Sequence, residues 1–266
     1  MKKFKLKFKP FSKRQLFAFS TIFLVLILLA TQLVSVQYRY PVTLIVVLAS
    51  FVFSVFCLRE DLSRHEWLTL LTLPTMFTLA VSYFYFLLPV RWITRLPVAV
   101  FYGIGFYALL LTENIFNVAG ERTIQLIRAA QTVGFYLTIV TSFLLFYLVM
   151  SLNLPFYANG LTFFVVSLLL FVQYLWSVEL TEHVERKTWT FSLVLALLMG
   201  EIGLTLSFWP LKTLTAGLML TSLFYALLGL AGYHFQERLL RRVALEFVIV
   251  PLIIFLIAFL TTSWTA

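Results

Sequence analysis

The segment TENIFNVAGERTIQLIRAAQ, residues 112–131, is the longest interruption of apolar sequence between the first apolar run and the C-terminus. If it forms one helix, at about 100° per residue, its polar side chains fall within an arc of about 120°. These side chains are Glu113, Asn114, Asn117, Glu121, Gln125, Arg128 and Gln131. The pattern predicts an amphipathic helix at a membrane surface, or a polar seam that continues into a membrane span. Gly120 is a poor helix former, and a break there divides the segment in two.

The rest of the chain is dominated by apolar residues. Of 266 residues, 62% are hydrophobic and 12% are charged, about half the charged fraction of a soluble domain. Apolar runs of about 20 residues recur along the chain, the length that a helix needs to cross a bilayer. The runs are continuous rather than alternating, which argues against a β-barrel. The sequence therefore predicts an all-α, polytopic transmembrane helix bundle, with residues 15–266 as a single domain.

Nine membrane spans are predicted from these runs, with turns between them. Their ranges are 15–35, 41–58, 67–88, 97–111, 132–152, 160–178, 188–209, 214–233 and 245–263. A longer alternative for the fourth span ends at Ala119.

The distribution of Lys and Arg predicts the orientation of the chain. Sixteen of the 20 fall on the side of the N-terminus, and Arg39, Arg91, Arg95 and Lys212 fall on the other. Since cytosolic segments carry the excess of positive charge, the N-terminus is predicted inside and the C-terminus outside. This places a multi-pass protein in the inner, or cytoplasmic, membrane of a bacterium. The net charge of +9 is explained by topology, so no nucleic-acid partner is predicted.

The N-terminal residues 1–14 form a basic tail with seven positive charges and no acid. One interpretation is a cytosolic tail that keeps the N-terminus inside. The other is an anchor on anionic lipid headgroups, since each juxtamembrane Lys contributes about 1 kcal/mol on an anionic leaflet.

Glu201 is the one acid predicted deep within a span. An ionised carboxylate in hydrocarbon is costly, so the group is expected to be protonated, paired or hydrated. Gly200 and Gly203 beside it allow a neighbouring helix to approach closely. Two interpretations stay open: a proton- or cation-coupling residue, or a neutral acid hydrogen-bonded between helices.

A weak metal-binding pattern lies at the predicted cytosolic end of the sixth span. Glu179 and His183 are four residues apart and share a face if the helix continues, with Glu182 beside them. An imidazole and two carboxylates suit a divalent metal. The alternative is a solvated helix end with ordinary ion pairs.

The polar seam itself supplies the first candidate substrate site. Glu113, Asn117, Glu121, Gln125 and Arg128 combine carboxylates, amides and a guanidinium. Such a set suits a phosphate headgroup or a carboxylate, because Arg binds both through two parallel hydrogen bonds. The alternative is an amphipathic helix that lies in the headgroup layer without a ligand.

No motif of a nucleotide-binding loop, hydrolase, metalloprotease or redox site is present, and no cofactor is predicted. The chain resembles multi-pass proteins of bacterial inner membranes in type only, without a motif that defines a family. Two functions fit: a non-enzymatic component, such as a small transporter or an accessory subunit with a protein partner at the inner face, or a membrane-embedded enzyme acting on a lipid-linked substrate at the inner leaflet. An enzyme requires the polar groups to converge on one cavity.

Overall fold

A computed structural model describes residues 12–31, 34, 38–59, 67–89, 91–118, 123–181 and 183–262. These residues form nine α-helices and no strand. The helices are α1 (Lys13–Ala30), α2 (Arg39–Leu58), α3 (Trp67–Leu87), α4 (Trp92–Asn117), α5 (Ile124–Ser151), α6 (Phe156–Glu179), α7 (Arg186–Leu206), α8 (Thr213–Phe235) and α9 (Arg241–Thr261). All nine are long and apolar enough to cross a membrane. The predicted fold class and the nine spans are therefore confirmed within the described residues.

Two boundaries differ instructively from the predicted ones. Helix α4 begins at Trp92 instead of Pro97, and its first turns carry Arg95. The guanidinium of Arg95 is buried over the ring of Tyr85, at 5.0 Å from the centroid, which offsets part of the cost of placing a cation there. The segment 112–131 is divided, since α4 ends at Asn117 and α5 begins at Ile124. Gly120, the weak point expected from sequence, lies in the gap between them.

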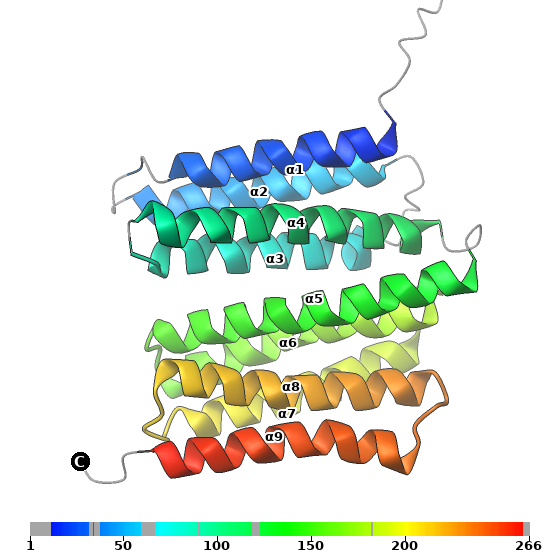
Figure 1. Ribbon diagram of the computed structural model, residues 1–266. Helices are drawn as coiled ribbons and strands as arrows, with labels where there is room; N and C mark the ends of the chain where they lie inside the picture. Colours follow the sequence, from blue (N-terminus) through cyan, green and yellow to red (C-terminus); the bar gives the residue numbers. More distant parts are fainter. Residues whose placement is uncertain are drawn as a thin grey trace, which may run out of the picture.

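Successive helices run in opposite directions, so the connecting segments gather at the two ends of the bundle (Figure 1). Helices α1–α4 form one group and α5–α9 another. The groups meet where α3 and α4 pack against α5 and α6. Helix α9 packs chiefly against α8 and exposes most of its surface.

Small residues bring α6 and α7 closest together. A Cβ atom on Gly160 would lie 3.2 Å from the carbonyl oxygen of Gly200, and the ring of Phe163 occupies the space where Gly203 lacks a side chain. Such close approach gives the dispersion contacts that hold helices together in lipid, where the hydrophobic effect does not. Gly200 and Gly203 therefore allow a neighbouring helix to approach closely, as the sequence predicted.

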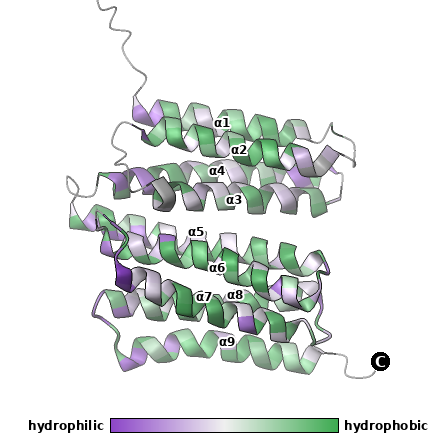
Figure 2. Ribbon diagram, turned by 180° about the vertical axis from the view of Figure 1, so that it is seen from behind, coloured by the Kyte–Doolittle hydropathy of each residue, from purple (hydrophilic) through white to green (hydrophobic). Residues whose placement is uncertain are grey.

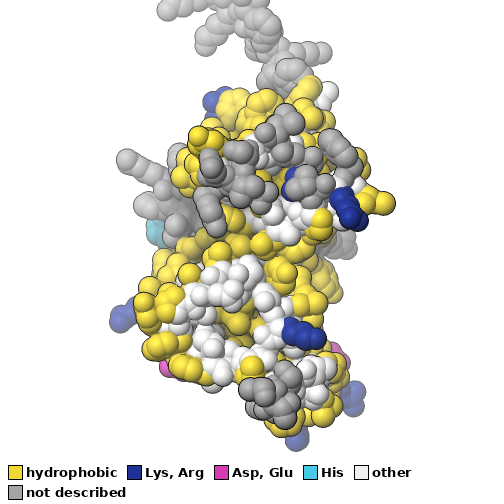
Figure 3. Space-filling view, turned by 90° about the vertical axis from the view of Figure 1, so that its left-hand side faces the viewer, with side chains coloured by type: hydrophobic (Ala, Val, Ile, Leu, Met, Phe, Trp, Pro, Cys, Tyr) yellow, Lys and Arg dark blue, Asp and Glu magenta, His cyan; other side chains and the backbone are white. Residues whose placement is uncertain are grey.

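Hydrophobic residues cover the length of the helices, and hydrophilic residues concentrate at their ends (Figure 2). Of the 13 Lys and Arg residues that the structure describes, nine lie at the end formed by the starts of α1, α5, α7 and α9 and the C-termini of α2 and α8. We call this end the basic end. The opposite end, which faces the viewer in Figure 3, shows few cationic side chains. The charge asymmetry predicted from sequence is thus present along one axis of the bundle.

Candidate functional site

A concave feature lies at the basic end, where α8 is flanked by α5 and α9. It consists of two hollows of about 260 and 420 Å³ that share Arg128, Gln131 and Gln236. We call the two together the basic groove. The smaller hollow forms its polar mouth, and the larger runs along the helices between aromatic side chains.

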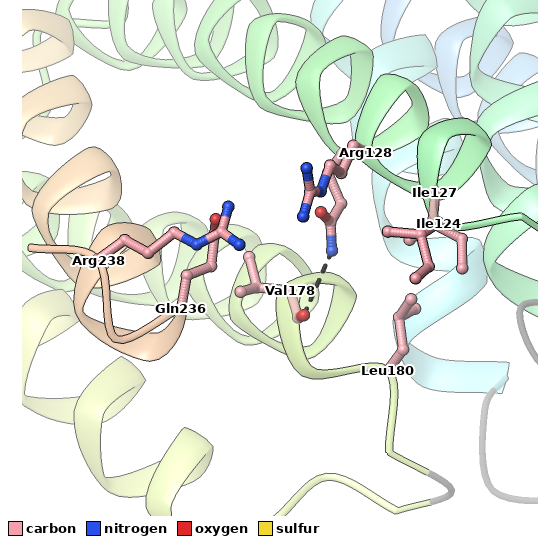
Figure 4. Close-up of a pocket in the computed structure, with 8 residues that line it drawn as sticks. Ile124, Ile127, Arg128, Val178, Leu180, Gln236 and Arg238 are labelled. Atoms are coloured by element: carbon pink, nitrogen blue, oxygen red, sulfur yellow. Dashed lines mark hydrogen bonds between the residues drawn. The ribbon is translucent and has the colours of Figure 1, made fainter.

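Two arginines extend into the mouth of the basic groove. Arg128 comes from the second turn of α5, and Arg238 follows the end of α8; both reach toward the same open space beside Gln236 (Figure 4). Both side chains are exposed. Neither forms an ion pair with a carboxylate of the described residues. The mouth therefore presents two guanidinium groups whose hydrogen-bond donors are available to a ligand.

The backbone at this mouth adopts unusual conformations. Three non-glycine residues of the described chain have positive φ, and two of them, Leu180 (φ 52°) and Glu237 (φ 55°), lie here. Glu237 ends α8 with the backbone N–H of Arg238 bonded to the Tyr233 carbonyl at 3.0 Å. This reversal turns Arg238 back over the helix end. Such conformations cost about 1–3 kcal/mol each and concentrate at functional sites.

The deeper part of the basic groove is lined by aromatic rings. The rings of Tyr225 and Phe247 are 5.0 Å apart, and Phe135 lies 5.6 Å from Tyr174. Gly229 on α8 makes room for the ring of Phe247, which a Cβ atom would meet. The groove thus joins a cationic mouth to an aromatic wall that continues into the membrane-spanning part of the bundle.

Gln131 fixes the boundary between these two parts. Its side-chain Nε2 donates to the carbonyl oxygens of Ser177 (3.0 Å) and Val178 (3.3 Å), which satisfies acceptors at the end of α6. This contact joins α5 to α6 directly beside Arg128.

The structure separates the residues of the predicted seam. Arg128 lines the basic groove, whereas Gln125 is exposed on the first turn of α5 and does not line it. Glu121 lies outside the described residues. Glu113 is completely buried and accepts a hydrogen bond from Gln173 Nε2 at 3.1 Å, and Asn117 donates to the Leu58 carbonyl at 3.1 Å. The break between α4 and α5 directs the two halves of the seam to different parts of the bundle.

The helical spacing assumed for the metal pattern is not observed. Helix α6 ends at Glu179, and Leu180 adopts a left-handed conformation, so His183 does not follow Glu179 on one helix face. Glu179 instead accepts a hydrogen bond from Thr188 at 2.6 Å and lies 3.9 Å from Lys187. No three metal-binding side chains gather among the described residues, from which Glu182 is missing.

Glu201 occupies different surroundings from those expected. Its side chain is exposed on the surface of α7, while Gly200 and Gly203 face α6. Because α7 ends at Leu206, Glu201 lies five residues, or about 7.5 Å, from the end of the helix. It is therefore not enclosed between helices of this chain, and its coupling role stays a prediction.

Sequence reasoning missed most of the basic groove. Tyr225, Gly229 and Tyr233 are spaced four residues apart, which places them on one face of α8. That spacing was readable from the sequence. The contribution of Arg238 was not, because it depends on the left-handed backbone at Glu237.

Fold and site together define a multi-pass membrane protein with an open cationic groove at one end. The chain belongs to the family described as "Protein of unknown function (DUF5656)", which matches residues 38–261 and so includes the whole of α2–α9. The basic groove lies wholly within this match. No curated protein and no solved structure matches the chain.

Proposed function

We propose that this protein is a non-enzymatic membrane component, of the small-transporter or accessory-subunit class, that binds the phosphate headgroup of a lipid or lipid-linked molecule. The observation that carries this proposal is the pair of unpaired guanidinium groups, Arg128 and Arg238, above an aromatic wall. The ligand is the phosphate headgroup that the sequence suggested for residues 112–131, but its site is the basic groove.

The two parts of the groove suit the two parts of such a ligand. Guanidinium groups bind phosphate oxygens through parallel hydrogen bonds, and each charge-assisted bond contributes about 1.5–3 kcal/mol. Tyr136 is 63% exposed on the surface of the bundle, and Tyr225 and Phe247 line the deeper hollow. These rings offer contact surface to the apolar chain of a lipid.

The charge distribution supports a cytosolic position for the basic end. On this proposal the inner leaflet of a bacterial cytoplasmic membrane supplies the ligand, and the basic tail, residues 1–14, adds a contact with anionic headgroups. Most of that tail lies outside the described residues. The same proposal includes a protein partner that binds at this end of the bundle.

The alternative, an enzyme acting on a lipid-linked substrate, has less support. Glu113 is sealed in the bundle, Arg128 lies in the basic groove, and His183 lies exposed beyond the end of α6. These groups do not surround one reacting atom, as acid–base chemistry requires.

Lipid binding to the purified protein tests the proposal. Native mass spectrometry in detergent would measure affinity for phosphatidylglycerol, for a long-chain isoprenyl phosphate and for phosphatidylcholine. We expect Arg128→Ala and Arg238→Ala each to weaken binding of the two anionic lipids at least roughly tenfold, because 1.4 kcal/mol corresponds to tenfold.

Arg242→Ala is the matched control, since it removes the same charge from the same end but does not line the groove. It should leave affinity unchanged within about twofold. Equal losses in all three variants would show nonspecific attraction and contradict a built site. Competition by inorganic phosphate as strong as that by lipid would show that the mouth recognises free phosphate instead.

A further inference from the structure

A second polar site lies apart from the basic groove, where α4 meets α6. Glu113 and Gln173 are both buried, with exposed fractions of 0% and 2%. Gln173 Nε2 donates to Glu113 Oε1 at 3.1 Å. The other carboxyl oxygen, Glu113 Oε2, and the amide oxygen of Gln173 have no hydrogen-bond partner.

No cation of the described residues compensates a charge on Glu113. Arg59 of α2 lies over the ring of Phe56, and Arg128 of α5 lies in the basic groove. Arg14 at the start of α1 forms no ion pair with Glu113. Helix α3 contains no charged residue.

Other ionisable groups on the neighbouring helices contact other residues or line the basic groove. Glu179 of α6 is engaged by Thr188 and Lys187, and Tyr174 lines the basic groove. Cys57 of α2 contacts the hydroxyl of Ser20 at 3.2 Å. An ionised Glu113 would therefore be a buried charge that no cation of the described residues compensates, and such a charge costs several kcal/mol.

One proton on Glu113 would give a hydrogen-bond partner to both Glu113 Oε2 and the Gln173 amide oxygen. A carboxylic acid has one O–H donor, and an amide has one oxygen acceptor and one N–H₂ donor group. With the proton on Oε2, Glu113 donates to the Gln173 amide oxygen while Oε1 continues to accept from Nε2. The acid and the amide would then form a complementary two-bond pair that uses both carboxyl oxygens and the amide oxygen.

A small cavity lies beside Gln173. It has a volume of about 60 Å³ and is lined by Gln173, Thr69, Thr72 and Trp189, among apolar neighbours. Glu113 does not line it, so its carboxyl group is sealed within the bundle.

We infer that Glu113 is a proton-binding residue that carries its proton while α4 and α6 are packed together. This inference is independent of the ligand of the basic groove. It assigns to Glu113 the neutral, hydrogen-bonded state that was one of the two interpretations for Glu201. The proton, rather than a metal or a cofactor, is the ligand of this site.

Infrared spectroscopy of the purified protein in lipid nanodiscs tests the assignment. We expect a carbonyl stretching band of a neutral carboxylic acid at neutral pH, shifted when H₂O is replaced by D₂O. The band should be lost in Glu113→Gln, which keeps the size of the side chain, and kept in the control Glu201→Gln. A wild-type spectrum without the band, or a band that survives in Glu113→Gln, would overturn the inference.

A second variant tests the pairing without removing the acid. Gln173→Leu should keep the band and move it to the frequency of a weakly hydrogen-bonded acid. An unmoved band would show that Glu113 donates elsewhere. If adding sodium at constant pH abolishes the wild-type band, the site binds a cation and the proton assignment fails.

Discussion

The Glu113–Gln173 contact and the basic groove both place polar groups near the same end of the bundle. The groups of the contact are buried, whereas those of the groove are exposed. At the first, a carboxyl and an amide are sealed among helices with no open space beyond a small cavity. At the second, two guanidinium groups stand exposed over hollows of about 260 and 420 Å³. Polar groups that satisfy each other can hold helices together, whereas those left open at a surface are free to bind a ligand.

The two sites also differ in what they connect. Glu113 and Gln173 bridge the α1–α4 group and the α5–α9 group, since α4 belongs to one and α6 to the other. The basic groove is built wholly from α5–α9 and the segments that follow α6 and α8. Changes at one site should therefore leave the other largely intact, because separate contacts contribute nearly independently.

The largest effect is expected from placing a charge at the sealed site. Glu113→Lys puts an ammonium group into a fully buried position where no carboxylate of the described residues pairs with it, which should cost about 3–5 kcal/mol. We expect the protein to be largely lost from the membrane fraction, as measured by immunoblot and by thermal unfolding in detergent.

Glu201→Lys is the control, with the same charge change on another spanning helix. Because Glu201 is exposed about 7.5 Å from the helix end, a Lys there can extend its ammonium group to the headgroup layer. Abundance should stay near that of the wild type. Equal abundance of the two variants would mean that Glu113 is not sealed.

A smaller effect should follow from adding one methyl group to the wall of the groove. In Gly229→Ala the new Cβ meets the ring of Phe247, so this ring must move from its place in the wall of the groove. Overpacking of this kind costs about 1–3 kcal/mol. We expect weaker binding of anionic lipid, measured as above, with the neutral-acid infrared band of Glu113 unchanged.

Gly134→Ala is the matched control on α5. Its Cβ would make ordinary contacts of 3.6–3.8 Å with Thr112 and Phe116, and Ala is the better helix former. It should be neutral or slightly stabilising and should not change lipid binding. Loss of the infrared band in Gly229→Ala would mean that the two sites are coupled through α6 or α8.

The positions of the membrane spans could be predicted from the sequence because each span is marked by a local pattern. Each apolar run carries its own length and composition, so α2, α3 and α8 begin and end within two residues of the predicted limits. The polar face of residues 112–131 could not be predicted in this way, because it depends on whether one helix continues through Gly120. Once the helix is broken, Glu113 and Arg128 no longer share a face, and no periodicity in the sequence relates them.

The partners of the candidate residues were beyond sequence reasoning for a similar reason. Gln173 lies 60 positions from Glu113 along the chain, and Arg238 lies 110 positions from Arg128. Only the packing of α4 and α6 against α3 and α5, and of α5 beside α8, brings each pair together. The Tyr225–Gly229–Tyr233 face, in contrast, was a local pattern and was available from the start.

The smallest perturbation is a reporter that leaves the bundle intact and determines which leaflet the basic groove faces. Nine helices of alternating direction place the two termini on opposite sides, and the charge bias predicts the C-terminus outside. A periplasm-active phosphatase fused after Ala266 should therefore be active, and a cytosol-only fluorescent reporter fused before Met1, ahead of α1, which starts at the basic end, should fluoresce. The reverse pair of results would place the groove at the outer leaflet. In that case Arg128 and Arg238 would still bind phosphate, but cytosolic lipid precursors would be excluded as ligands, and Glu113 would take its proton from the periplasmic side.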